Sequence, residues 1–181
     1  MVYVLLGEGF EESEAIVPVD LLRRAGVEVS LAGVTDKTVL SSHGIAVTCE
    51  CTLREIDEEN LTMVFLPGGL GGVEAIQASE TALGIVQRAA DRGAYIAAIC
   101  AAPTILARLG LLDRRQAVCY PGMEDQMLSA VVKKGSPVVT DGHIITGEAA
   151  GSAFEFGLKL VEILTDAQTA QQVRQAVHYH H

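Results

Sequence analysis

Basic side chains are scarce in this sequence, and their scarcity excludes two classes of partner. The 181 residues include 13 Lys and Arg but 23 Asp and Glu, which gives a formal net charge of −10, and no run of Lys or Arg interrupts this acidity. The phosphates of a nucleic acid or of an anionic membrane surface would therefore be repelled. We expect neither a nucleic acid nor a membrane among the partners of this protein.

Long apolar runs and an export signal are also missing. No apolar segment approaches the roughly 20 residues that are needed to span a bilayer. The opening residues 1–6 lack the basic stretch with which a secretory signal begins. We therefore expect a soluble, cytoplasmic protein.

Cysteine pairs with a redox or zinc-binding spacing are absent as well. The four cysteines stand at positions 49, 51, 100 and 119, and no two of them form a C-x-x-C motif. A chain of this length can build a core without disulfides, so reduced thiols are expected. The Cys49 and Cys51 pair lacks partners that would complete a zinc site, and we predict neither a metal nor a cofactor.

Apolar residues are abundant, and they recur in an alternation of strands and helices. They make up 49% of the chain, which is enough for one domain over residues 1–177, with 178–181 as a frayed tail or the remnant of a tag. Buried strands are predicted at 2–6, 27–34, 63–66 and 95–99, with helices at 13–25 and 73–92 between them. Right-handed crossovers between such strands make the sheet parallel. The predicted fold is α/β: a flavodoxin-like (Rossmann-like), doubly wound, mainly parallel sheet with helices on both faces.

The other expected elements are shorter. We predict a hairpin from 39–40 and 45–48, a short acidic helix over 52–59, and strands at 116–119, 138–140 and 143–146. Ser152 and Glu155 have the spacing of a capping box that opens a helix ending near residue 164, and a final helix is expected over 167–177.

The segment 94–104 is typical of a strand, a tight turn and a helix, with Cys100 at the turn. Pro103 is tolerated in the first turn of a helix, so the helix is expected to begin at Cys100 or Ala101. A cysteine on such an elbow is exposed for attack, and the helix N-terminus favours its thiolate. The alternative is that Cys100 is a small apolar residue of the core.

The loop after the first strand, residues 7–14, is acidic. It begins like a dinucleotide-binding fingerprint, but Glu12 occupies the third glycine position and further carboxylates surround it, so a pyrophosphate would be repelled. If one of these carboxyl groups points toward Cys100, the two groups would share one proton. The alternative is that the carboxylates merely stabilise a helix N-terminus from solvent.

The loop after the strand at 63–66 contains four glycines, at 68, 69, 71 and 72. Backbone amides in such a loop can stabilise the oxyanion that forms when a thiolate adds to a carbonyl group. The alternative is a turn that needs a positive φ, which would explain one or two of the glycines.

These motifs together resemble the ThiJ/PfpI superfamily, in particular the branch of the parkinsonism-associated deglycase. The resemblance rests on Glu-Glu-Ser-Glu at 11–14, Leu-Pro-Gly-Gly at 66–69, Ala-Ala-Ile-Cys-Ala at 97–101 and Ser-Ala-Phe-Glu-Phe-Gly at 152–157. It implies a homodimer that acts without a cofactor on a small carbonyl substrate. It also implies that Cys100 is reactive and easily oxidised, that Glu14 hydrogen-bonds to it, and that the amides of Gly69, Leu70 and Ala101 are candidate oxyanion donors.

Three departures from the family pattern concern the pocket. Ala101 stands where protease-like relatives often carry a histidine base, and Tyr120 replaces the histidine of a Thr-His-Pro segment. His43 replaces an arginine near the hairpin bend, so we expect Tyr120 and His43 at the pocket.

The leading hypothesis is an enzyme acting on α-oxoaldehydes or their early adducts, of the glyoxalase III or deglycase type. A redox-sensing or chaperone-like protein with an oxidisable cysteine is the alternative. A peptidase or amidase is the least favoured reading.

Overall fold

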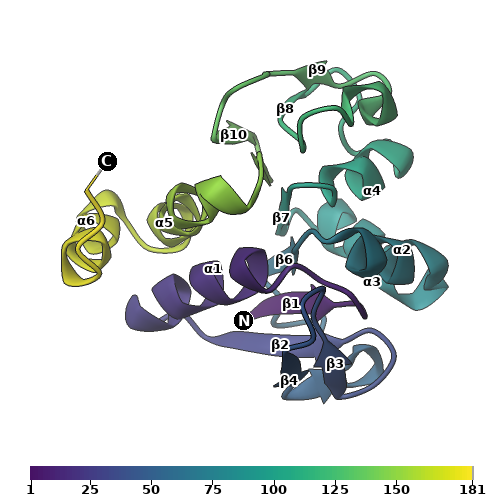
Figure 1. Ribbon diagram of the computed structural model, residues 1–181, viewed down its shortest axis with the longest axis horizontal. Coiled ribbons are helices and arrows are strands. Elements are labelled where there is room, and N and C mark those ends of the chain that lie inside the picture. Colours follow the sequence, from purple (N-terminus) through teal and green to yellow (C-terminus); the bar gives the residue numbers. More distant parts are fainter. Residues whose placement is uncertain (181) are drawn as a thin grey trace.

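A sheet between two layers of helices organises the chain, whose computed structural model describes residues 1–180 (Figure 1). Within these residues, seven strands form the main sheet in the order β10-β11-β7-β6-β1-β2-β5. All neighbouring strands pair in parallel except β10 and β11, which are antiparallel. The predicted flavodoxin-like fold, with a mainly parallel sheet, is confirmed.

The strands of the main sheet are β1 (Val2–Leu6), β2 (Val29–Gly33), β5 (Cys51–Thr52), β6 (Met63–Leu66), β7 (Tyr95–Ile99), β10 (Val138–Asp141) and β11 (Ile144–Gly147). Two small sheets pair β3 (Thr38–Leu40) with β4 (Ala46–Thr48), and β8 (Gln116–Ala117) with β9 (Val131–Val132). The α-helices are α1 (Glu12–Arg24), α2 (Leu70–Ala78), α3 (Glu80–Asp91), α4 (Pro103–Arg108), α5 (Ala153–Leu164) and α6 (Ala167–Ala176). Single 3₁₀ turns occupy Leu53–Glu55, Glu124–Met127 and Ala150–Ser152.

Successive side chains of the central strands enter opposite cores, as the alternation of a β-strand requires. In β1, Tyr3 and Leu5 belong to the core beneath α2, α3 and α4, whereas Val4 and Leu6 belong to the core beneath α1, α5 and α6. Figure 1 shows these two groups of helices on either side of the strands. Because both faces are covered, the carboxyl ends of the strands remain as the place for a site.

Two expected helices differ from the structure. The helix expected over 73–92 is divided into α2 and α3, because Ser79 adopts extended backbone and its hydroxyl accepts a hydrogen bond from the Ala82 amide as the cap of α3. The short acidic helix expected over 52–59 is reduced to a 3₁₀ turn, since the Glu55 carboxylate bonds back to the amide and hydroxyl of Thr52.

The end of the chain also differs from expectation in two places. Ser152 does not cap α5 with its side chain; its hydroxyl bonds to the backbone of Ala149 instead. Tyr179, expected to be frayed, stacks on Phe154 with ring centroids 5.3 Å apart. Residue 181 of that tail lies outside the described residues. Within 1–180, no helix has both the length and the apolar character that crossing a bilayer demands.

Candidate active site

Cys100 lies on a strained turn between β7 and α4. Its φ is +66°, a left-handed conformation that is uncommon outside glycine and that recurs at nucleophile elbows. Its amide donates to the Gly147 carbonyl at 3.0 Å, and its carbonyl accepts from the Tyr120 amide at 2.7 Å. The strand, turn and helix are confirmed, but the helix begins at Pro103, because a left-handed residue cannot belong to a right-handed helix.

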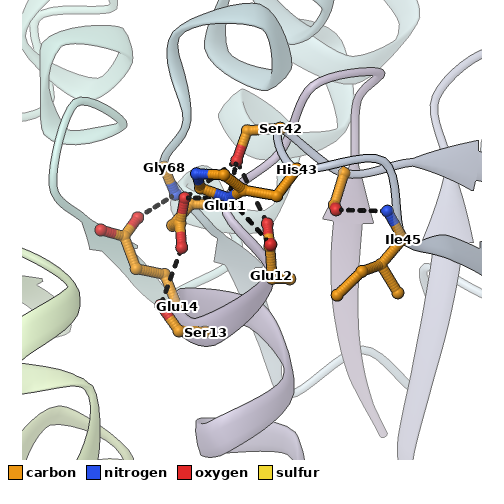
Figure 2. A network of polar contacts seen from close by, with 9 residues as sticks. Glu11, Glu12, Ser13, Glu14, Ser42, His43, Ile45 and Gly68 are labelled. Atoms are coloured by element: carbon orange, nitrogen blue, oxygen red, sulfur yellow. Dashed lines mark hydrogen bonds and ion pairs between the residues drawn. The ribbon is translucent and has the colours of Figure 1, made fainter.

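Glu14 brings a buried carboxyl group to this turn. It lies in the first turn of α1, is 1% exposed, and accepts a hydrogen bond from the Gly68 amide at 3.0 Å. Figure 2 shows its carboxyl group directed at Gly68, away from Glu12 and His43. Its carboxyl group lies beside the Cys100 sulfur next to Gly68, and hydrogen bonding between the two groups contributes to the pKa of each. The structure thus brings together the two residues that the resemblance pairs.

Gly68 allows this pairing because it has no side chain. A Cβ atom at this position would lie 2.3 Å from the Glu14 carboxylate and 2.6 Å from the Cys100 Cβ, both shorter than any real contact. Gly69 meets a different requirement, since its φ of +86° suits the residue that precedes α2. The two glycines thus serve different purposes, one of space and one of backbone conformation.

Burial raises the pKa of both acidic groups of the site. Burial raises the pKa of Glu14 to about 7, against a hydrogen bond from Cys100 and with help from the negative charge of Glu11. Burial also raises the pKa of the Cys100 thiol, to about 12, and the charge and hydrogen bond of Glu14 add to that rise. The amides of Gly69 and Ala101 act in the opposite direction, because they donate to the sulfur. The pair therefore holds one proton, which can lie on the carboxylate or on the sulfur.

A pocket of about 720 Å³ opens above this pair. Its walls come from the loops that follow β1, β6, β7 and β11, together with the segment after β8. Among the predicted residues it includes Cys100, Glu14, Gly69, Leu70, Ala101 and Tyr120. The three loops that were predicted to meet at the carboxyl ends of the strands therefore all line this pocket.

Some residues that line the pocket were not predicted from the sequence. Gln126 comes from the 3₁₀ turn Glu124–Met127 after β8, which has no periodic signal in the sequence. Ala150 lies in the loop after β11, and its amide lowers the pKa of Glu14 by hydrogen bonding. A signal for this last loop was present, because it follows a strand next to β7 in the sheet.

His43 does not line the pocket. Its Nδ1 lies 2.8 Å from Glu12 Oε1 and 3.7 Å from Glu11 Oε2, and its side chain is 70% exposed. Figure 2 shows Glu12, Ser42 and His43 together on the side of the acidic loop opposite Glu14. The expectation that His43 contributes to the pocket is corrected, because the hairpin carries it to the outer surface of this loop.

The cluster of Glu11, Glu12 and His43 has the spacing of metal ligands. One ligand atom from each residue lies within 4.8 Å of the others. The Ser42 hydroxyl already lies within hydrogen-bond distance of both carboxylates, at 2.9 Å from Glu11 and 3.1 Å from Glu12. Since these contacts account for the cluster, we assign no metal to it.

Comparisons with known proteins agree with this geometry. A sequence model of the DJ-1/PfpI family matches residues 1–163. Protein dj-1beta of Drosophila melanogaster is 36% identical over 172 residues, which cover 94% of this chain and 92% of that protein. Deglycase PH1704 of Pyrococcus horikoshii is 30% identical over 164 residues, which cover 90% of this chain and 98% of that protein.

Solved structures show the same likeness in three dimensions. The crystal structure of Drosophila melanogaster DJ-1beta matches with a TM-score of 0.95 and 34% identity, over 99% of this chain and 98% of that one. The structure of Toxoplasma gondii DJ-1, described as oxidized, matches with a TM-score of 0.94 and 33% identity over the same shares.

Proposed function

The chain belongs to the DJ-1/PfpI family, and we propose that it is a cofactor-independent cysteine enzyme acting on α-oxoaldehydes or the early adducts that these form with thiols and amines. The observation that carries this proposal is the pairing of the buried carboxyl group of Glu14 with the half-buried Cys100 at the floor of a pocket. A relative named a deglycase gives further support.

The first step is the addition of the Cys100 thiolate to the aldehyde carbon of a substrate such as methylglyoxal. When the shared proton lies on Glu14, the sulfur carries the negative charge and the carboxyl group no longer repels it. A carbon–sulfur bond forms, and the aldehyde oxygen becomes an oxyanion. The amides of Gly69 and Ala101, which already face the sulfur, are placed to stabilise that oxyanion.

The second step moves a proton from one substrate carbon to its neighbour. Glu14 gives its proton to the oxyanion, and its carboxylate then takes the hydrogen of the former aldehyde carbon. That proton returns to the adjacent carbon, and the hydroxyl proton on the former aldehyde oxygen moves to the former ketone oxygen. The ketone thereby becomes a hydroxyl group and the adduct becomes a thioester. Water hydrolyses the thioester, which releases the hydroxy acid and restores the thiol. One water is consumed, and no external oxidant or reductant is required.

Replacement of Cys100 by Ser tests this proposal. We expect the variant to lose conversion of methylglyoxal to lactate, measured by proton NMR, because a hydroxyl group in this site would not ionise. Cys51→Ser is the matched control, since Cys51 lies outside the pocket and hydrogen-bonds the Leu31 carbonyl in the sheet. Full activity of the purified Cys100→Ser variant would show that the assignment is wrong.

A second function, redox sensing in a stress-response or chaperone-like protein, is favoured by the exposure of the cysteines. Cys100 is half-buried at a pocket, whereas Cys49 and Cys119 are buried and less accessible to an oxidant. A protonated Glu14 could donate to a sulfinate on Cys100. After mild peroxide, mass spectrometry should find two added oxygens on Cys100 before any other cysteine reacts; earlier oxidation of Cys51 would contradict this function.

A peptidase or amidase is not proposed. Such an enzyme needs a histidine base beside the cysteine, and no histidine lines the pocket in the described part of the chain.

The cysteines at 49, 51, 100 and 119 are free thiols. Free thiols persist in a reducing compartment, which supports a cytoplasmic location.

A further inference from the structure

The charged side chains of the pocket are of one sign. Glu11 and Glu14 both line it, and among its described lining residues there is no Lys, Arg or His. The remaining lining is apolar, apart from backbone groups and the side chains of Tyr120 and Gln126. The pocket therefore offers an anionic ligand no positively charged side chain.

Glu11 holds a fixed negative charge at this pocket. It precedes α1, and its carboxylate accepts hydrogen bonds from the hydroxyls of Ser13 and Ser42, each at 2.9 Å. Two donors of this kind fix the position of the carboxylate. Its side chain is 21% exposed, so solvent screens its charge only in part.

The basic group beside Glu11, the His43 imidazole, pairs mainly with Glu12. The imidazole of His43 lies closer to Glu12, at 2.8 Å, than to Glu11, at 3.7 Å. The charge of Glu11 also reaches across the site, because it adds to the rise of the Glu14 pKa. Glu11 thus acts on the same small volume in which a substrate must approach Cys100.

We propose that Glu11 is a specificity-determining residue that repels carboxylate-bearing compounds from Cys100, so that the pocket takes neutral or cationic aldehydes. An anionic substrate would approach one negative charge on Glu11 and a second one on the Glu14–Cys100 pair. Addition would then create an oxyanion beside both. As a statement about substrates the inference rests on the proposed function, and it predicts discrimination between methylglyoxal and glyoxylate, which carries a carboxylate.

The test uses two alkylating reagents that differ in charge, iodoacetamide and iodoacetate. The rate constant of each for Cys100 is measured by peptide mass spectrometry, and their ratio cancels any change in the thiol itself. In Glu11→Gln, we expect the rate for iodoacetate, relative to that for iodoacetamide, to rise about tenfold. Glu12→Gln is the matched control, because it removes the same charge one residue away from a side chain outside the pocket; its ratio should stay within about twofold of wild type.

A third variant separates charge from local structure. Glu11→Asp keeps the charge, so it should retain most of the discrimination against iodoacetate. The inference is overturned if Glu11→Gln leaves the ratio unchanged, if Glu12→Gln changes it equally, or if Glu11→Asp behaves like Glu11→Gln. The same variants are assayed with methylglyoxal and glyoxylate. If wild type converts neither aldehyde, the proposed function fails, while the alkylation ratios still decide the role of Glu11.

Discussion

The protonation of Cys100 depends on Glu14, and the protonation of Glu14 depends on Cys100. Burial makes two negative charges costly in this site, so carboxylate and thiolate do not form together near neutral pH. The shared proton lets Glu14 act as an acid when Cys100 attacks and as a base afterwards. An ordinary surface glutamate would be ionised at neutral pH and would have no proton to give.

The burial of Glu14 has a consequence for stability. Its pKa in the folded protein is about 7, above the ordinary value of 4.5, so folding favours the protonated form. The stability from this group is fully present below pH 4.5 and is lost as the pH rises through 7. Relative to Glu14→Gln, the unfolding free energy of wild type should fall by up to about 3 kcal/mol over that range. Denaturant unfolding at several pH values measures this difference, and parallel pH profiles for the two proteins would contradict it.

At the residue scale, the sequence predicted which side chains carry the chemistry better than it predicted where a side chain such as His43 points. Cys100 and the acidic loop could be selected because they follow strands that lie close in the sheet. Which carboxyl group of that loop pairs with Cys100 was predicted only by the family resemblance, which pointed to Glu14. The side of the acidic loop that His43 faces could not be predicted, because it depends on how the hairpin docks. That docking rests on backbone bonds such as Gly9 to Leu40 and Ser42 to Phe10, which have no signature in the sequence.

At the element scale, close packing between loops holds the site together. A Cβ atom on Gly7 would lie 2.5 Å from the Gly72 carbonyl, so the backbone of the loop after β1 packs directly against the first turn of α2. Thr146 of β11 accepts a hydrogen bond from the Val118 amide at 2.9 Å, which fixes the segment that carries Tyr120. The pocket is thus formed by loops tied to one another as well as to the sheet.

Replacement of Gly68 by Ala tests this packing. The added methyl group would push Glu14 and Cys100 apart, so we expect methylglyoxal conversion to fall at least about 100-fold and stability to fall by about 1–3 kcal/mol. Gly84→Ala in α3 is the control, because its Cβ would meet only the flexible tip of Arg88. The control should stay active, and a fully active Gly68→Ala variant would exclude the proposed role of this glycine.

Long elements were predictable from periodicity, and short ones were not. The expected strands at 2–6 and 63–66 match β1 and β6, since each is a buried run of the usual length. The strands β5 and β9 have two residues each, too few for any pattern to identify. The break between α2 and α3 was missed because the apolar pattern continues across Ser79, while the capping bond that ends it is local.

At the scale of the whole molecule, the order of the strands brings three segments to one edge of the sheet. They are the acidic loop after β1, the glycine-containing loop after β6 and the turn at Cys100. β1, β6, β7 and β11 are consecutive neighbours, so the loops at their carboxyl ends meet. The acidic surface of this molecule, with its net charge of −10, continues into the pocket through Glu11 and Glu14.

We also propose that the chain forms a homodimer. Ile16 of α1 and Ile45, next to β4, are exposed large apolar side chains, and a partner subunit would remove them from water. Light scattering should give about twice the chain mass of 19.1 kDa. A monomer mass across the micromolar range would contradict the proposal.

The shared proton of Cys100 and Glu14 is tested most directly by the pH dependence of Cys100 alkylation with iodoacetamide. In wild type, the rate should rise as the pH passes through about 7, because the pair loses its first proton there. In Glu14→Gln that step should be absent, and the rate should follow the ionisation of a lone thiol. Superimposable profiles for the two proteins would remove Glu14 from the site and contradict the account.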